Sequence, residues 1–213
     1  IDFSGFVSAV DYVGGIDVAV SNPLDDYAYP IEGKEDELCG HTQEEVDSLV
    51  ATAEAELSLD VFPCRYKHIH FDSGEQHMDG QTALEFVRSR HGLGSEGSDF
   101  ARSRRQQEVI SALRKKTLSL GIILNPVKVI GLANILKENI NTDIQQNEYD
   151  DFVKLADKMK DAKIRSFVLG QEDGQSYGLF IHPETLQGYG GKWVLVPRIG
   201  SSDFSEVKEF IEC

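Results

Sequence analysis

Apolar and polar residues alternate along the chain with two periods, that of a helix and that of a strand. Residues 2–13 repeat apolar side chains at helical spacing, and two glycines then end this helix before the apolar run IDVAV. Residues 66–71, YKHIHF, alternate as a strand does, whereas 21–37 contain proline, glycine and acids and are predicted to be a loop. Helical and strand patterns in this order predict an α/β fold in which helices flank a mixed central sheet.

Further helices are predicted along the rest of the chain. Thr42 and Glu45 match a capping box that precedes an apolar stripe. Helices are also predicted at 79–90, at 100–118, from Pro126 and around 152–159. No repeat or linker divides the chain, so residues 1–213 are predicted to form one domain, in which 171–213 are a weakly marked tail with short strands and a helix.

The composition restricts the class of ligand. The formal net charge of −15 opposes general affinity for nucleic acid or for an anionic membrane surface, so any anion site must be local. The most apolar stretch, Leu118 to Leu136, carries Asn125, Pro126 and Lys128 and does not match a membrane-spanning helix. The chain opens on IDFSGF without a leader and is expected to be a piece of a longer protein.

One segment departs from the acidic composition. Residues 86–107, FVRSRHGLGSEGSDFARSRRQQ, contain five arginines and no lysine. Arg88 and Arg90 precede a glycine-rich run that does not continue a helix, so the pair is expected to lie side by side at a turn. Arginine binds phosphate through two parallel hydrogen bonds and remains charged when partly desolvated.

The helix that follows this turn combines polar and apolar residues on one stripe. Ser98 or Asp99 is the expected cap. The stripe consists of Arg102, Arg105, Gln106, Val109 and Leu113. Guanidinium and amide groups that lead into aliphatic side chains suit a ligand with an anionic head and an apolar tail. Asp99 is the nearest acid that could orient these arginines, and Arg104 is expected to be solvated.

A second interpretation of the arginines remains open at this point. They could form a solvated helix face that pairs with the acidic body of the protein. The absence of lysine favours the anion site, since a merely solvated face is expected to mix the two residues.

The cysteines and histidines also leave alternatives. Cys39 and Cys64 bracket a helical insertion and either form a disulfide or remain two free thiols in a reducing compartment. His68 and His70 lie on one face of a strand, as a metal pair does, but no carboxylate or third histidine follows at ligand spacing. We therefore interpret them as a structural or surface pair.

Three segments resemble the LytR-CpsA-Psr (LCP) family of bacterial cell-envelope proteins. They are IDFSGFVSAVDYVGGIDVAV at 1–20, HMDGQTALEFVRSR at 77–90 and SDFARSRRQQEVISAL at 98–113. The third is the most specific, because Asp99, Arg102, Arg105 and Gln106 follow an arginine pair in the family's order and approximate spacing. The resemblance extends more weakly to about residue 170.

The resemblance implies an LCP-like fold with an apolar cavity for a polyprenyl chain. It implies a phosphotransferase that moves a glycopolymer from a polyprenyl-pyrophosphate carrier onto peptidoglycan, or hydrolyses the lipid when no acceptor is present. Arg88, Arg90, Asp99 and Arg102 would be catalytic. Substrate-binding positions would be Arg105, Gln106, Val109 and Leu113. Family members use magnesium, face outward and are membrane-anchored, here by a segment outside this chain.

This chain also departs from the family pattern, and that departure leaves a second function open. The acidic residues expected to hold magnesium would lie upstream of Ile1, so the metal ligands are unknown. The alternative is a non-enzymatic envelope module that binds polyprenyl phosphates or a glycan. Some family names refer to transcriptional regulation. This sequence has no helix-turn-helix pattern with a basic recognition helix, and its charge of −15 opposes that function.

Overall fold

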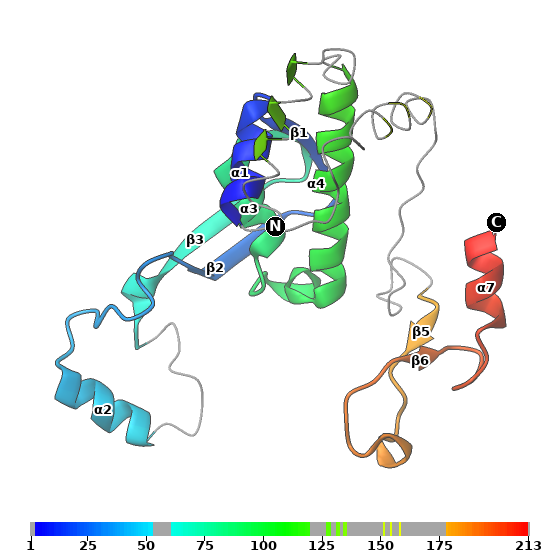
Figure 1. The fold of residues 1–213 in the computed structure, drawn as a ribbon. Helices are drawn as coiled ribbons and strands as arrows, with labels where there is room; N and C mark the ends of the chain where they lie inside the picture. Colours follow the sequence, from blue (N-terminus) through cyan, green and yellow to red (C-terminus); the bar gives the residue numbers. More distant parts are fainter. Residues whose placement is uncertain are drawn as a thin grey trace. The chain divides into compact units, whose positions relative to one another are not determined.

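The computed structural model describes residues 3–52, 61–119 and 178–212, with isolated positions between 127 and 158 (Figure 1). The chain divides into two compact units, Ile1–Ile164 and Arg165–Cys213. The first contains α1 (Phe3–Tyr12), β1 (Ile16–Val20), β2 (Leu24–Pro30), α2 (Gln43–Thr52), the 3-10 helix η1 (Pro63–Arg65), β3 (Tyr66–Phe71), β4 (Gly74–Met78), α3 (Gly80–Arg88), the 3-10 helix η2 (Gly94–Gly97) and α4 (Asp99–Ser119). The second contains β5 (Phe180–Ile181), the 3-10 helix η4 (Gln187–Tyr189), β6 (Val196–Pro197) and α7 (Ser205–Glu212).

These elements confirm the predicted α/β class. In the first unit β1 pairs with β4 and β2 pairs with β3, and in the second unit β5 pairs with β6. Every pairing among the described strands is antiparallel. The β2–β3 ladder places Leu24 opposite Phe71, and its register shifts between Asp26 and Tyr29.

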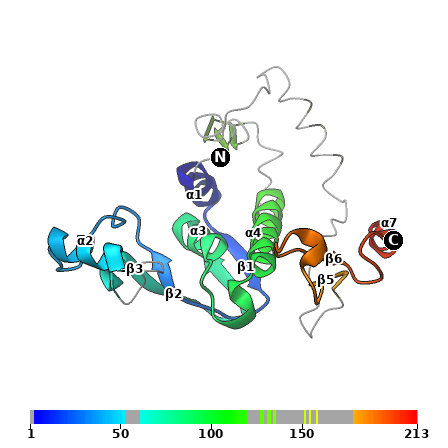
Figure 2. The same ribbon diagram turned by 90° about the horizontal axis from the view of Figure 1, so that it is seen from below.

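Helices and strands of the first unit enclose one apolar core. Helix α1 packs against α3, and α4 packs against β1 and α3 (Figures 1 and 2). At the contact of α1 with α3, a Cβ on Gly80 would overlap the Val7 carbonyl, so this position requires glycine. The core consists of Val10, Val13, Ile16, Val18, Val20, Leu24, Tyr29, Ile69, Phe71, Met78, Ala83, Phe86, Val109 and Ala112.

Two segments differ from the sequence prediction. Residues 21–37 were predicted to be a loop, yet they contain strand β2. The hydrophobic pattern did not reveal this strand, because an acid, Asp26, occupies one of its core-facing positions. Gly74–Met78 forms strand β4. The sequence did not predict this strand, because the turn residues Asp72, Ser73 and Gly74 mark the end of the preceding one. The helix predicted from Pro126 and the one predicted around 152–159 lie largely outside the described residues.

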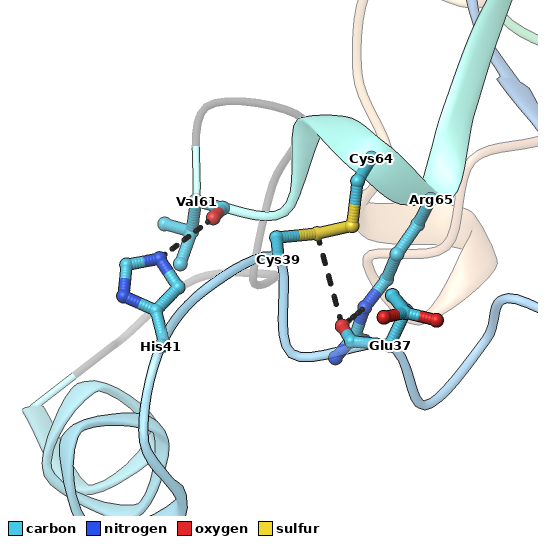
Figure 3. The surroundings of a disulfide bond; sticks show 6 residues. All are labelled: Glu37, Cys39, His41, Val61, Cys64 and Arg65. Atoms are coloured by element: carbon cyan, nitrogen blue, oxygen red, sulfur yellow. Dashed lines mark hydrogen bonds between the residues drawn. A yellow bond between two sulfur atoms is a disulfide. The ribbon is translucent and has the colours of Figure 1, made fainter.

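The insertion between β2 and β3 begins as the sequence predicts. The backbone N–H of Thr42 donates to Glu45 Oε2 at 2.8 Å, and the N–H of Glu45 donates to Thr42 Oγ1 at 3.3 Å, which is a capping box at the start of α2. Of the two states left open for the cysteines, the structure has the disulfide between Cys39 and Cys64 (Figure 3). Arg65 Nε donates to the Glu37 carbonyl at 2.7 Å beside this bond. The disulfide and this hydrogen bond tie the two ends of the insertion together.

Candidate anion-binding site

A pocket of about 360 Å³ lies in the first unit at the end of α3. Its lining residues are Phe3, Tyr29, Pro30, Val87, Arg88, Arg90, His91, Arg102 and Gln106. Three arginines and one amide therefore meet in one cavity, and no carboxylate belongs to this described lining. In a chain of net charge −15 this is a local concentration of positive charge of the kind that can hold an anion.

Arg88 and Arg90 reach this pocket because the chain leaves the helix between them. Arg88 is the last residue of α3, and Ser89 adopts an extended conformation with φ −49° and ψ 132°. Both arginines line the pocket, as expected for a pair at a turn. The Arg88 guanidinium lies 4.1 Å from the centre of the Phe3 ring, a cation–π contact that holds it in place.

Arg102 and Gln106 lie one turn apart on α4, so both face the pocket. Arg102 Nη1 lies 2.7 Å from Asp99 Oδ1, which is the ion pair expected from the sequence. Ser98 caps the helix, since its Oγ accepts from the N–H of Ala101 at 3.1 Å. Asp99 is far more exposed than Arg102, so it orients the guanidinium from the solvent side.

Arg105 lies elsewhere on α4 and is 1% exposed. Its guanidinium donates to the Phe86 and Ser89 carbonyls at 3.0 and 2.8 Å, and to the Glu96 carbonyl and carboxylate at 3.0 and 2.9 Å. Burial lowers the pKa of Arg105, and the Glu96 carboxylate opposes that shift. Arg105 is not among the lining residues, and this geometry favours a role in holding α3, η2 and α4 together over the predicted role as a phosphate ligand.

Glu96 is the acid that the sequence analysis missed. It is 5% exposed and accepts hydrogen bonds from Arg105, from Arg104 and, at 3.0 Å, from Asn22 Nδ2. Arg104, expected to be only solvated, is thus ion-paired. In the sequence Glu96 is a single acid between two loop glycines, followed by the adjacent pair Arg104 and Arg105, and this pattern is the signal from which it could have been predicted.

A second buried acid fixes the loop that carries the arginine pair. Asp26 is fully buried, and its Oδ2 accepts from the Ser89 hydroxyl at 2.7 Å and from the His91 N–H at 3.2 Å. Its Oδ1 accepts from the Ala28 N–H at 2.9 Å. Asp26 therefore holds the backbone on both sides of Arg90. In the sequence Asp26 is simply one of two adjacent acids, Asp25 and Asp26, with no motif around them.

Tyr29 is the tyrosine among the residues that line the pocket. Burial raises the pKa of Tyr29, with Arg88 acting in the opposite direction. A phenol is protonated at neutral pH at its ordinary pKa, and the upward shift keeps it so, which leaves Tyr29 a hydrogen-bond donor.

The apolar part of the predicted stripe turns toward the core. Val109 is 2% exposed, and Leu113 packs against the core cluster. Neither residue is among those that line the pocket. The apolar surface of the pocket instead comes from Phe3, Pro30 and Val87. A longer apolar cavity for a lipid chain stays a prediction.

The residues that line the pocket do not by themselves fit a magnesium ion. The pocket lining offers no carboxylate, and magnesium prefers carboxylate and phosphate oxygens. Within the described part of the chain, one group of three ligand-type side chains converges, Asp25 with His68 and His70, and its imidazoles do not suit that ion. Asp25 is the carboxylate that the sequence spacing did not reveal, because it comes from the neighbouring strand.

Comparisons with known proteins place this chain in a family. The family model described as the LytR_cpsA_psr family matches residues 1–186, so the chain belongs to the LytR-CpsA-Psr family. It is 28% identical over 148 residues to the polyisoprenyl-teichoic acid–peptidoglycan teichoic acid transferase TagV of Bacillus subtilis, covering 70% of this chain and 28% of that protein. It is 27% identical over 139 residues to the cell wall biosynthesis protein LcpA of Corynebacterium glutamicum, covering 65% of this chain and 19% of that protein.

A solved structure agrees with the fold. The crystal structure of B. subtilis TagV matches with a TM-score of 0.53 and 22% identity, over 100% of this chain and 61% of that chain. The chain thus spans only part of the length of the relatives that it matches. Within the described residues, no helix combines the length and apolar character needed to cross a bilayer.

Proposed function

We propose that this chain forms the pyrophosphate-binding part of a phosphotransferase that moves a glycopolymer from a polyprenyl-pyrophosphate carrier onto peptidoglycan at the cell envelope. The observation that carries the proposal is the meeting of Arg88, Arg90 and Arg102 in one pocket of an acidic chain. Membership of the LytR-CpsA-Psr family supports it. The printed names of two relatives, a teichoic acid transferase and a cell wall biosynthesis protein, point the same way.

The pocket suits a pyrophosphate in both charge and shape. Arginine forks bind two oxygens of one phosphate, and the Gln106 amide and the protonated Tyr29 hydroxyl add neutral donors. Phe3 and Val87 provide an apolar wall on which the first carbons of a prenyl tail can lie.

The arginines act on the charge that develops during transfer. An acceptor hydroxyl oxygen attacks the phosphorus that bears the glycopolymer, the bond from that phosphorus to the bridging oxygen breaks, and polyprenyl monophosphate leaves. The hydroxyl proton passes to solvent. Negative charge grows on the bridging oxygen, and guanidinium groups already positioned there stabilise it without reorganisation. When water attacks instead, the same step hydrolyses the lipid.

The family resemblance implies magnesium, but the described pocket lining contains no carboxylate to hold that ion, and the proposed transfer includes no step that depends on it. Membrane anchoring and an outward-facing location likewise belong to the proposal for the whole protein.

Calorimetric titration with a short polyprenyl pyrophosphate tests the binding step. Each of the variants Arg88→Ala and Arg102→Ala should weaken binding by at least about tenfold, since a charged hydrogen bond to phosphate is lost. Arg114→Ala is the matched control, because Arg114 lies on α4 but does not line the pocket. Inorganic pyrophosphate as a second ligand separates recognition of the head group from recognition of the tail.

A transfer assay with the whole protein tests the chemistry. Arg88→Ala and Arg102→Ala should lose transfer while circular dichroism stays unchanged, and normal transfer by both would refute the proposal. His91 is the residue of the described lining that could act as a general base, but no carboxylate lies there to hold a metal ion, and this favours the second candidate, a module that binds the lipid without reaction. Tight binding that depends on Arg102, with no turnover by the whole wild-type protein, would support that module.

A further inference from the structure

Three metal-ligand side chains converge on the exposed face of the β2–β3 strand pair. Figure 1 shows this pair of strands. Asp25 Oδ1 lies 2.9 Å from His68 Nε2 and 2.9 Å from His70 Nδ1. One ligand atom from each residue lies within 4.8 Å of the other two. The three groups surround one point in space.

The strand register explains why these residues meet. His68 and His70 are two positions apart on β3, so both side chains leave the same face of the strand. Asp25 on β2 is paired directly with His70 across the ladder. The neighbouring residues Leu24, Ile69 and Phe71 are buried on the opposite face and fix this register.

We propose that Asp25, His68 and His70 bind a zinc ion, with water as the fourth ligand. Two imidazole nitrogens and one carboxylate oxygen are a donor set that zinc uses at open, four-coordinate sites. Bonds of 2.0–2.1 Å in a tetrahedron separate the ligand atoms by about 3.3 Å, so the two distances of 2.9 Å need to open only slightly. In the complex the coordinating nitrogen of each imidazole carries no proton, and any proton displaced from it by the ion passes to solvent.

The surroundings hold both imidazoles in the orientation that zinc requires. His70 Nε2 lies 3.2 Å from Asp72 Oδ1, so the nitrogen that does not bind the metal donates to a carboxylate. The His68 ring stacks on Tyr27 with ring centres 3.9 Å apart and an angle of 4° between the planes. These contacts fix the two rings before the ion arrives.

The position also admits an ion from solvent. The side chains of Asp25, His68 and His70 are 32%, 43% and 46% exposed. The chain offers an internal comparison, because His77 Nδ1 lies 2.7 Å from Asp17 Oδ1 on the β1–β4 pair, with similar exposure. Within the described residues that pair belongs to no group of three ligands, so it lacks the third donor.

Titration of the metal-free chain with zinc chloride, in excess magnesium chloride, tests the site. Cys213→Ser is used as the background, because a thiol outside the Cys39–Cys64 disulfide would bind zinc itself. One equivalent should bind, and His68→Gln or His70→Gln should each weaken binding by at least about tenfold. His77→Gln is the matched control and should bind as the background protein does. Asp72→Asn should reduce the affinity less than either ligand variant, since Asp72 only orients His70.

Thermal unfolding gives an independent readout. Without zinc the variants His68→Gln, His70→Gln and His77→Gln should melt with the background protein. Zinc should raise the melting temperature of the background protein and of His77→Gln by more than it raises that of His68→Gln or His70→Gln. Absence of one-equivalent binding would overturn the proposal. Equal weakening by His77→Gln and His68→Gln, or unchanged affinity in both ligand variants, would also overturn it.

Discussion

The hydroxyl of Ser89 donates a hydrogen bond of 2.7 Å to the carboxylate of Asp26, and both residues are buried. Ser89 stands between Arg88 and Arg90, while Asp26 belongs to strand β2. Asp26 also accepts from the His91 N–H, on the far side of Arg90. One buried carboxylate thus sets the backbone that presents two of the three arginines in the pocket.

Replacement of Asp26 by asparagine should therefore affect both stability and anion binding. The amide group opposes the N–H donor of His91, and a buried donor without an acceptor costs about 1–3 kcal/mol. Urea unfolding measures that loss, and titration with polyprenyl pyrophosphate measures the accompanying loss of affinity. Asp17→Asn removes an exposed carboxylate from β1 and should change stability by no more than about 0.5 kcal/mol. Equal stability of the two variants would contradict this role of Asp26.

Two arginines of α4 should respond differently when each is replaced by lysine. Arg105 makes four buried hydrogen bonds from three nitrogens, and an ammonium group cannot reach all of these acceptors. Arg105→Lys should lower the free energy of unfolding by about 1–3 kcal/mol, the cost of leaving buried carbonyl acceptors without a donor. Arg102→Lys alters one surface pair and should cost at most about 1 kcal/mol, but it should weaken pyrophosphate binding.

Chemical denaturation of both lysine variants, with pyrophosphate-lipid titration of each folded protein, separates the two roles. If Arg105→Lys retained wild-type stability and only lost affinity, Arg105 would be a ligand residue, as the sequence predicted. A strong loss of stability in Arg102→Lys would equally contradict the assignment.

The sequence predicted the helices and part of the site because local patterns determine them. The apolar spacing in α1, α3 and α4 and the capping box at Thr42 depend on residues within one or two turns. Arg88, Arg90, Arg102 and Gln106 were found in the same way, by an arginine-only composition beside glycines and by the family resemblance.

The rest of the fold and of the site could not be predicted, because it depends on contacts between residues that are far apart in the sequence. Strand β2 was read as a loop because its buried positions include Asp26, whose partners lie 63 and 65 residues away. Arg102 and Arg105 share one stripe on a helical wheel, yet only the packing of α3 and η2 decides that Arg105 is buried. The carboxylate beside His68 and His70 comes from β2, so spacing along β3 could not reveal it.

The N-cap of α3 predicts a dependence of stability on pH. The backbone N–H of Thr82 donates to Asp79 at 2.8 Å and lowers the pKa of that carboxyl below its ordinary value of 3.8. A lowered pKa in the folded state adds stability above the ordinary value, and this contribution is lost as the pH falls through the lower, folded-state value.

Asp79→Asn should remove this part of the acid sensitivity, because asparagine caps the helix without titrating. Asp79→Ala should lose about 1 kcal/mol at neutral pH and also show less additional loss in acid. Urea midpoints measured from neutral pH down through 3.8 provide the test. Parallel pH profiles for the wild type and Asp79→Asn would show that the cap does not carry the effect.

The disulfide should stabilise the first unit by restricting its unfolded chain. Cys39 and Cys64 are 25 positions apart, and closing a loop of that size removes entropy from the unfolded state worth about 3 kcal/mol. Cys39→Ser/Cys64→Ser should lower the free energy of unfolding by up to about that amount. The fold should persist, because none of the described residues in 31–68 belongs to the core cluster and the Arg65 hydrogen bond to Glu37 still joins the ends. Reduced wild-type protein should unfold at the same urea concentration as this variant, while pyrophosphate-lipid binding stays unchanged, because neither cysteine lines the pocket. Loss of that binding in the double variant would show instead that the insertion supports the arginine site.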